Sequence, residues 1–573
     1  MNNTTKIERS FVSNELEIKW EGIEPYFKAL VKRELKSLED LKQWLRDRSE
    51  LAAVLEEEFA WRYIRMNIET ENMEFQKAFQ FFVQEINPKL APYQDELNRK
   101  LHSCPHSHKL KAAEYQNLLK SCETQIALYR EANIPLFTQL EEDAQKFGAL
   151  AAKMSVEIDG KEYTLQQAAK FLKSTNRDKR ERSYRLIQKR RLKDKTALNE
   201  LFDKLIKLRQ DVSQNAGFAN YRDYKFKALE RFDYSVEDCE VFHKSIKQAV
   251  VPLAETVDRK RKALLQLDQL RPWDTAVDLD EKQPLEPFES ADELIEKTIK
   301  CFDRIDPFFG DCIREMKRKK HLDLESKKGK APGGFNYPLY ESGLPFIFMN
   351  AVGSMRDVTT MLHEGGHAIH SVLAHPLELV EFKSPPSEVA ELASMSMELI
   401  SMDQWDVFFD NEDELNRAKR EQLLDVLSTL PWVATIDKFQ HWIYTNPDHT
   451  HEERYAFWCN LMDDFGSNVV DWSGLEEERK NLWQKQLHLY EVPFYYIEYG
   501  MAQLGAIALW RNYRNDPKKT IAQYKAALQV GYTKSIGEIY QTAGIEFNFS
   551  EAYVGELMNF VQEEINLTFN TKL

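Results

Sequence analysis

One pentapeptide, His363-Glu364-Gly365-Gly366-His367, constrains this 573-residue chain more than any other feature of its sequence. It fits the pattern H-E-x-x-H, in which two histidines stand four residues apart. On a helix that spacing puts both imidazoles on one face, where they can reach a single ion about 2 Å away. We therefore expect a helix with His363 and His367 as metal ligands. Glu364 would lie beside the metal and could take a proton from a bound water molecule.

The residues around the pentapeptide support such a helix. Asp357 can add negative charge near its start, and His375-Pro376 should stop it. Apolar residues recur between these limits at Val358, Met361, Leu362, Ile369 and Val372. The two central glycines cost a helix about 1 kcal/mol each relative to alanine. We therefore expect that the backbone needs room at this point, either for a substrate or for tight packing.

A third ligand must come from another segment, and the sequence Ser387–Glu398 is the candidate. Ser387 follows two prolines and could cap a helix that carries three carboxylates, Glu388, Glu391 and Glu398. Glu391 and Glu398 are two turns apart on one face, so one could bind the metal while the other orients a ligand histidine. The spacing alone leaves Glu388 open as the ligand.

An aromatic segment near the C-terminal end could supply hydrogen-bond donors to a developing oxyanion. The stretch from residue 488 to 499 reads HLYEVPFYYIEY and contains one histidine and four tyrosines. Tyr496 and Tyr499 are three residues apart and would share a helical face. An ordinary aromatic core explains such a stretch equally well, so only its combination with the metal motif favours a functional role.

Most of the remaining chain has the periodicity of helices. From Leu35 to about Leu101 apolar residues recur every three or four positions among dense charge. An exception is the segment 154–164, where Asp159-Gly160 between β-prone residues predicts a type I′ hairpin. Residues 271–291 and 327–334 are expected as loops, and residues 345–350 (PFIFMN) as a short strand.

Composition narrows the classes of partner. A net charge of −15 argues against a nucleic-acid binder, and the basic stretch 173–195 is interpreted as a solvated helix face. The sequence contains no run of about 18 apolar residues, which a membrane span would need. The first twenty residues also lack an apolar signal segment. We therefore expect a cytoplasmic protein with no membrane partner. The six cysteines form no CxxC pair and are expected as reduced thiols. The histidine-rich stretch 102–108 (HSCPHSH) is expected as an exposed loop.

Four sequence blocks resemble the thimet oligopeptidase/oligoendopeptidase F family of zinc metallopeptidases, and the bacterial oligoendopeptidase F branch most of all. They are PGGFNYPLYESGLPFIFMNAVGS before the pentapeptide, HEGGHAIH across it, EVAELASMSME after it, and HLYEVPFYYIEYGMAQLGAIALW near the end. With their helical context they cover most of the chain from about residue 200 onward. The N-terminal part fits the family's helical domain more loosely.

The resemblance implies a fold and a set of site residues. It implies a mainly α-helical, two-lobed zincin-type structure with a deep central channel and a small β-sheet beside the zinc. We expect an N-terminal helical domain over residues 1–195 and a catalytic domain over residues 196–573. The family pattern makes Glu391 the third ligand and Glu398 the residue that orients a ligand histidine. It assigns transition-state roles to His488, Tyr496 and Tyr499, although Tyr495 leaves a one-position ambiguity for the first tyrosine. It also implies that the edge of the strand with Phe346, Phe348 and Asn350 pairs with the substrate.

The expected function is therefore a zinc-dependent endopeptidase with one Zn²⁺ per chain that hydrolyses internal bonds of short peptides. Glu364 would activate a zinc-bound water. Two alternatives stay open. A zinc exopeptidase would need an acidic cluster that recognises a peptide N-terminus, and a non-catalytic peptide-binding protein would lack part of the site.

Overall fold

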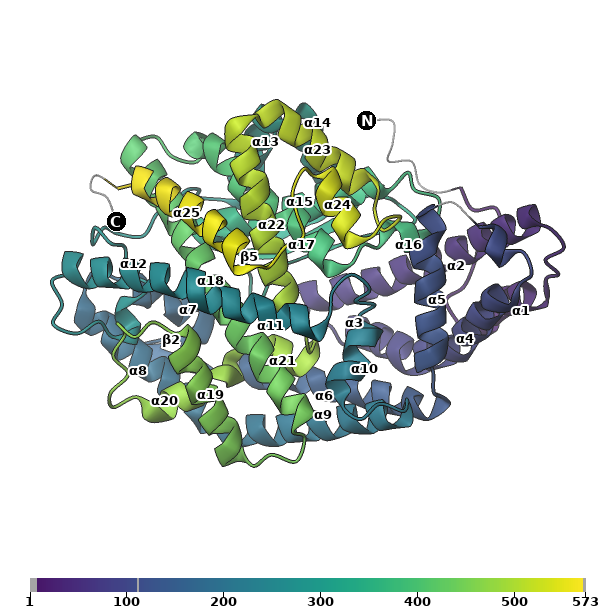
Figure 1. Ribbon diagram of the computed structural model, residues 1–573, viewed down its shortest axis with the longest axis horizontal. Helices are drawn as coiled ribbons and strands as arrows, with labels where there is room; N and C mark the ends of the chain where they lie inside the picture. The colour runs from purple at the N-terminus through teal and green to yellow at the C-terminus, as the bar shows by residue number, and fades with distance from the viewer. Residues whose placement is uncertain (1–7, 111–112, 570–573) are drawn as a thin grey trace.

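The chain folds mainly as α-helices, with two small β-sheets (Figure 1). The computed structural model describes residues 8–110 and 113–569. Residues 1–7, the beginning of the segment inspected for a secretory signal, lie outside the described part. The mainly α-helical fold expected from the sequence is confirmed. No helix in residues 8–110 or 113–569 has the length and apolar character needed to cross a membrane.

The N-terminal helices occupy one end of the molecule (Figure 1). The predicted helical stretch Leu35–Leu101 is confirmed, with breaks where polar residues or a π-turn interrupt it. The longest helix of this group begins after Ser37, whose side chain accepts a hydrogen bond from the Asp40 N–H. The group comprises α1 (Trp20–Lys32), α2 (Leu38–Ile68), α3 (Met73–Phe81), α4 (Asn87–Ser103) and α5 (Gln116–Leu128).

The predicted hairpin is also confirmed. Strands β1 (Ser155–Ile158) and β2 (Lys161–Thr164) pair antiparallel, and Val156 lies opposite Tyr163. Asp159 and Gly160 both have positive φ, 54° and 75°, as a type I′ turn requires. The hairpin leads through α7 (Leu165–Ala169) to α8 (Arg177–Lys193), the helix that contains most of the basic stretch.

Helices also make up most of the remaining chain, and the two predicted loops interrupt them. Residues 275–290 contain no regular element, and Lys327–Gly334 connects two strands. The elements before the metal motif are α6 (Ile134–Ala152), α9 (Lys195–Asn215), α10 (Tyr221–Ala228), α11 (Val236–Ser245), α12 (Val251–Leu264), α13 (Ala291–Ile305) and α14 (Pro307–Lys319). Those from the motif onward are α15 (Met355–Ala374), α16 (Val380–Lys383), α17 (Ser387–Ser401), α18 (Glu412–Thr445), α19 (His451–Phe465), α20 (Glu476–Lys480), α21 (Leu487–Glu491), α22 (Tyr496–Asn515), α23 (Pro517–Gln529), α24 (Ile536–Thr542) and α25 (Glu551–Leu567).

The second sheet has three strands in the order β3-β5-β4. The strand predicted at PFIFMN is β5 (Phe346–Ala351), and it pairs in parallel with β3 (Leu322–Glu325) and antiparallel with β4 (Phe335–Tyr337). Phe348 lies between Asp323 and Phe335, so both edges of β5 are already paired there. Ile347 is paired on both sides as well, so the expectation that an edge of this strand pairs with a substrate is wrong over Ile347–Phe348.

The two largest clusters of buried apolar residues are a large core and a smaller N-terminal core. The smaller core gathers residues of α1, α2, α4 and α5 together with Leu379 and Phe382 from the segment around α16. The large core begins at Leu128 and extends to Ile565. Along the chain, the change from the smaller core to the large core thus falls before residue 195. The domain limits expected from the sequence stay a prediction.

Candidate metal centre

Helix α15 presents the pentapeptide and is fixed at both ends. At its start the Asp357 side chain accepts hydrogen bonds from the N–H groups of Ser354 and Val352, at 2.8 and 2.9 Å. Asp357, which was expected to add negative charge near the start of the helix, thus forms a capping box with Ser354. The helix ends at Ala374, just before Pro376, as expected.

The two central glycines allow neighbouring groups to approach α15 closely. A Cβ built on Gly366 would lie 2.7 Å from the Ala393 carbonyl oxygen and 2.7 Å from the Ser394 Cα, both in α17. A Cβ on Gly365 would lie 2.7 Å from the Phe302 ring. Of the two expectations for these glycines, tight packing is the one confirmed. The absence of a side chain at Gly366 lets the helix with Glu391 reach the two histidines.

The structure brings the three predicted metal ligands together. The Nε2 atoms of His363 and His367 lie 3.3 and 3.6 Å from Oε2 of Glu391, and one ligand atom from each residue lies within 4.8 Å of the others. Four ligands held tetrahedrally at 2.0–2.1 Å from an ion are roughly 3.3 Å apart. The donor set and its spacing therefore fit a zinc-sized ion. The side chains of His363 and His367 are both 19% exposed, so the centre is accessible to small molecules.

Glu398 contacts one of the two histidines predicted as ligands. The Nδ1 atom of His363 lies 2.6 Å from Oε1 of Glu398, which leaves Nε2 directed at the centre. Gln422 of α18 donates from Nε2 to the second oxygen of Glu398 at 2.7 Å. Sequence reasoning missed Gln422, because it lies on a distant helix and no spacing pattern connects it to Glu398.

Glu391 also receives two hydrogen bonds. The Tyr495 hydroxyl donates to its Oε1 at 2.8 Å, and the Ser394 hydroxyl donates to its Oε2 at 3.0 Å. Glu388, the alternative ligand, points elsewhere and contacts Tyr234. Ser387 was expected as the helix cap, but it is the first helical residue, and no side chain caps α17.

The charge states around the centre suit a cation. Burial alone would raise the pKa of Glu391, but the nearby His367 and His363 outweigh it and hold this pKa at about 2. Burial lowers the pKa of His367 to about 4, so its imidazole is neutral. Against the effect of burial, hydrogen bonds to Glu391 and Glu398 raise the pKa of His363 well above its usual range.

Glu364 has a different environment from the ligands. Its residue is 6% exposed, and burial raises the pKa of its carboxyl to about 7. The proximity of Glu391 and Glu398 acts in the same direction, whereas His363 opposes it. A carboxyl with a pKa near neutrality can both accept and return a proton.

The aromatic segment lies beside this centre. The His488 ring centroid is 4.8 Å from that of Tyr496 and 5.7 Å from that of Tyr499. Burial raises the pKa of Tyr496 to about 12 and that of Tyr499 well above its ordinary value, so both hydroxyls keep their protons and can donate. Burial lowers the pKa of His488 to about 4. The role of these residues stays a prediction, while Tyr495 is the tyrosine that contacts the ligand carboxylate.

The residues expected to bind substrate make contacts within and beside the sheet, and their role stays a prediction. Phe346 and Phe348 are 4% and 0% exposed, and Phe348 stacks on Phe335 with ring centroids 4.7 Å apart. The Asn350 amide donates to the carbonyls of Ala331 and Gly333. The strand with an unpaired edge on this side is β4, whose Asn336 amide contacts the Glu364 carbonyl oxygen at 3.3 Å.

Comparison with protein families decides the class. The model of peptidase family M3 matches residues 170–559, and that of the peptidase M3 N-terminal domain matches residues 16–129. The chain belongs to peptidase family M3. This M3 chain is therefore a metallo-oligopeptidase, a metal-dependent enzyme that acts on peptides.

Individual relatives of this M3 peptidase agree with the family. Oligopeptidase PepF of Bacillus subtilis (strain 168) is 21% identical over 492 residues, which are 84% of this chain and 69% of that protein. The solved structure of PZ peptidase A with inhibitor 2 has a TM-score of 0.91 at 25% identity and covers 97% of this chain and 99% of its own. A structure of a putative oligoendopeptidase F has a TM-score of 0.90 at 26% identity, with the same coverage.

The structure also describes the histidine-rich stretch 102–108, the residue His370 on α15 and the six cysteines of this M3 peptidase. His102 is exposed and Cys104 half-buried, and no metal-binding group within residues 8–110 and 113–569 includes a residue of the stretch 102–108. His370 is 3% exposed and burial lowers its pKa to about 3, so it is a neutral core residue of α15. The six cysteines are free thiols, as expected.

Proposed function

We propose that this M3 peptidase is a zinc-dependent endopeptidase that hydrolyses internal bonds of short peptides. One observation carries the proposal: His363, His367 and Glu391 converge with ligand-atom separations of 3.3 and 3.6 Å, next to the buried Glu364. Three protein ligands leave the fourth position of a tetrahedral ion open, as catalytic zinc sites require.

His363, His367 and Glu391 would hold the metal, and Glu398 would keep His363 in the right orientation. When bound, zinc supplies Lewis-acid polarisation of a carbonyl and makes water more acidic. Two imidazoles and one carboxylate also accept cobalt or manganese, so the choice of zinc rests on the ligand types and their spacing.

Glu364 is assigned the role of general base and then general acid. Its carboxylate takes a proton from the attacking water and later delivers that proton to the leaving amine. The pKa of about 7 supports both steps, because a group titrating near the working pH exchanges a proton at little cost in either direction.

The hydroxyls of Tyr499 and Tyr496 and the His488 ring are assigned to the oxyanion. Their donors would stabilise the negative charge that develops on the scissile carbonyl oxygen. The raised pKa values of both tyrosines support donation, since these hydroxyls stay protonated at any ordinary pH.

The substrate backbone would lie along the unpaired edge of β4, beside α15, where Asn336 contacts the Glu364 carbonyl. Pairing with a strand requires an extended, flexible peptide, which favours short peptides over folded proteins. The names of the similar proteins, oligopeptidase and oligoendopeptidase, support the same preference. A deep channel between two lobes and a cytoplasmic location are further parts of this proposal.

Digestion of a mixed-length peptide library beside a folded protein tests the proposal. Cleavage is read by mass spectrometry with and without a chelator. We expect internal cleavage of peptides only, abolished by the chelator and restored by zinc. Loss of terminal residues alone would favour an exopeptidase. Intact peptides after incubation with zinc-loaded protein would favour a peptide-binding protein.

A further inference from the structure

Two helices far from each other in sequence bring four metal-ligand side chains together outside the catalytic centre. Cys239 and His243 are four residues apart on α11, and Asp437 and His441 are four residues apart on α18. The spacing puts each pair on one helical face, as in the catalytic motif. The four residues are 0%, 3%, 0% and 8% exposed, so the cluster is enclosed in the core.

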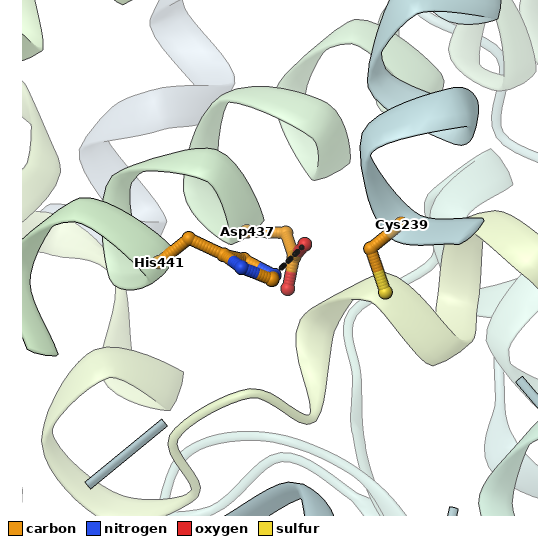
Figure 2. Close-up of side chains that lie close together, drawn as sticks. All are labelled: Cys239, Asp437 and His441. Carbon is orange, nitrogen blue, oxygen red and sulfur yellow. Dashed lines mark ion pairs between the residues drawn. The ribbon is translucent and has the colours of Figure 1, made fainter. Parts of the chain in front are cut away.

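The side chains converge on the Asp437 carboxylate. Figure 2 shows it between the His441 ring and the Cys239 thiol. The Nε2 of His243 lies 2.8 Å from Asp437 Oδ2, and the Nε2 of His441 lies 3.1 Å from the same oxygen. One ligand atom each from Cys239, Asp437 and His441 lies within 4.8 Å of the other two. Three ligand-type groups therefore surround one small volume, and His243 contacts the Asp437 carboxylate among them.

Hydrogen bonds within the protein leave this cluster unsatisfied. Among the described residues Asp437 Oδ1 has no hydrogen-bond partner, and the contact of His441 Nε2 with Oδ2 lacks the alignment of a hydrogen bond. Both atoms are fully buried. A buried polar atom without a partner is costly and uncommon in folded proteins, and an ion is one explanation for it.

We propose that Cys239, Asp437 and His441 form a second metal site for a zinc-class divalent cation, distinct from the catalytic centre, with His243 in contact with the Asp437 carboxylate beside it. Sulfur and imidazole ligands select this class of ion over magnesium or calcium. The cluster is enclosed in the core, so the site is structural and joins α11 to α18. Binding converts the Cys239 thiol to a thiolate, and its proton goes to solvent. Because the cluster is buried, the ion enters as the chain folds.

The two proposed metal sites can be distinguished experimentally, because only the second one contains a sulfur ligand. The test uses the full chain with both catalytic histidines replaced, His363→Ala and His367→Ala, refolded with Zn²⁺ or Co²⁺ and then desalted. We expect one metal per chain in this variant and two in the wild type. The cobalt form of the variant should show a thiolate-to-cobalt charge-transfer band.

Cys239→Ser added to that variant should abolish the band. Cys301→Ser is the matched control, because Cys301 is also a free, fully buried cysteine and belongs to no metal-binding group among the described residues. It should leave both the band and the metal content unchanged. Circular dichroism checks that each variant is folded.

X-ray absorption at the zinc edge of the refolded double-histidine variant needs no cysteine substitution. One sulfur neighbour at about 2.3 Å together with nitrogen or oxygen neighbours is expected. A metal-free double-histidine variant, or zinc bound by nitrogen and oxygen alone, would overturn the proposal. The cluster would then be a hydrogen-bonded core group without an ion. Neither result depends on whether the enzyme is active.

Discussion

At the scale of single residues, the buried carboxyl of Glu364 offers the most direct test of the proposed chemistry. Glu364→Gln keeps the shape of the side chain but removes its capacity to exchange a proton. We expect kcat/KM to fall by about 10²–10⁴. Metal content measured by atomic spectroscopy should be unchanged, because Glu364 is not in the ligand set. Activity within a few-fold of wild type would contradict the assignment of the base.

Tyr495 and Tyr496 are adjacent in sequence but face different partners. The Tyr495 hydroxyl donates to the ligand Glu391 at 2.8 Å, so Tyr495→Phe should weaken metal binding by about 10–100-fold, the usual cost of losing a ligand's supporting hydrogen bond. Tyr496→Phe should lower kcat and leave metal affinity unchanged. Competition with a chromophoric chelator measures the affinity of each variant, and each serves as the control for the other. Equal effects on affinity would show that the two tyrosines do not divide these roles.

The sequence predicted the residue types of the centre better than their supporting contacts. His363, His367, Glu391 and Glu398 were named from the spacing on helices and a family resemblance, and the structure brings them together. The sequence did not indicate Gln422, because its hydrogen bond to Glu398 depends on how α18 lies relative to α17 and not on any local pattern.

At the scale of elements, the close approach of α15 and α17 determines whether the ligands can meet. A Cβ at Gly366 would lie 2.7 Å from the Ala393 oxygen and the Ser394 Cα, which are backbone atoms that cannot rotate away. Gly366→Ala should therefore separate the helices, destabilise the protein by about 1–3 kcal/mol and weaken metal binding. Chemical denaturation and metal titration measure the two effects.

Gly555→Ala is the matched control for that substitution. Gly555 lies inside α25, and a Cβ there would meet nothing within 4 Å. Alanine loses less conformational freedom than glycine on folding into a helix, so this variant should be more stable than wild type by about 0.5–1 kcal/mol. Stabilisation by both substitutions would contradict the packing argument for Gly366.

The sequence predicted the positions of helices, turns and strands more reliably than it predicted which strand has an open edge. The limits of α15, the hairpin at Asp159-Gly160 and the strand at PFIFMN agree with local patterns, because they depend on periodicity and turn chemistry. The expected open edge of β5 was wrong, since its neighbours β3 and β4 are set by chain topology. Nothing within six residues of β5 indicates which strands pair with it.

At the scale of the whole molecule, two hydrophobic cores meet around α16. Leu379 and Phe382 pack into the N-terminal core, and the Val380 N–H donates to the Ser49 hydroxyl at 2.7 Å. Helix α2 also reaches the small sheet, where Ala60 and Ile64 pack with Phe346 and Phe348. The proposed metal ligands, in contrast, all lie on α15 and α17, whose buried apolar residues belong to the large core.

This arrangement predicts a local response to metal removal. A ligand present at 1,000 times its Kd stabilises the folded state by about 4 kcal/mol, and that stabilisation is lost on chelation. Because the ligands connect α15 to α17, amide hydrogen exchange should accelerate in these helices and at the start of α22, where Tyr495 precedes Tyr496. Amides of α2 and α4 should exchange as before, since their core contains no catalytic ligand.

The His363→Ala/His367→Ala variant separates the two proposed metal sites in the same experiment. It should resemble the chelated protein in α15 and α17 before any chelator is added. Refolding this variant without metal, instead of with zinc, should accelerate exchange in α11 and α18 by leaving out the ion between Cys239 and His441, whereas equal exchange after both refolding reactions would leave a single metal site. Faster exchange spread evenly over both cores would contradict the local role of the metal. It would mean that the metal stabilises the two cores as one cooperative unit.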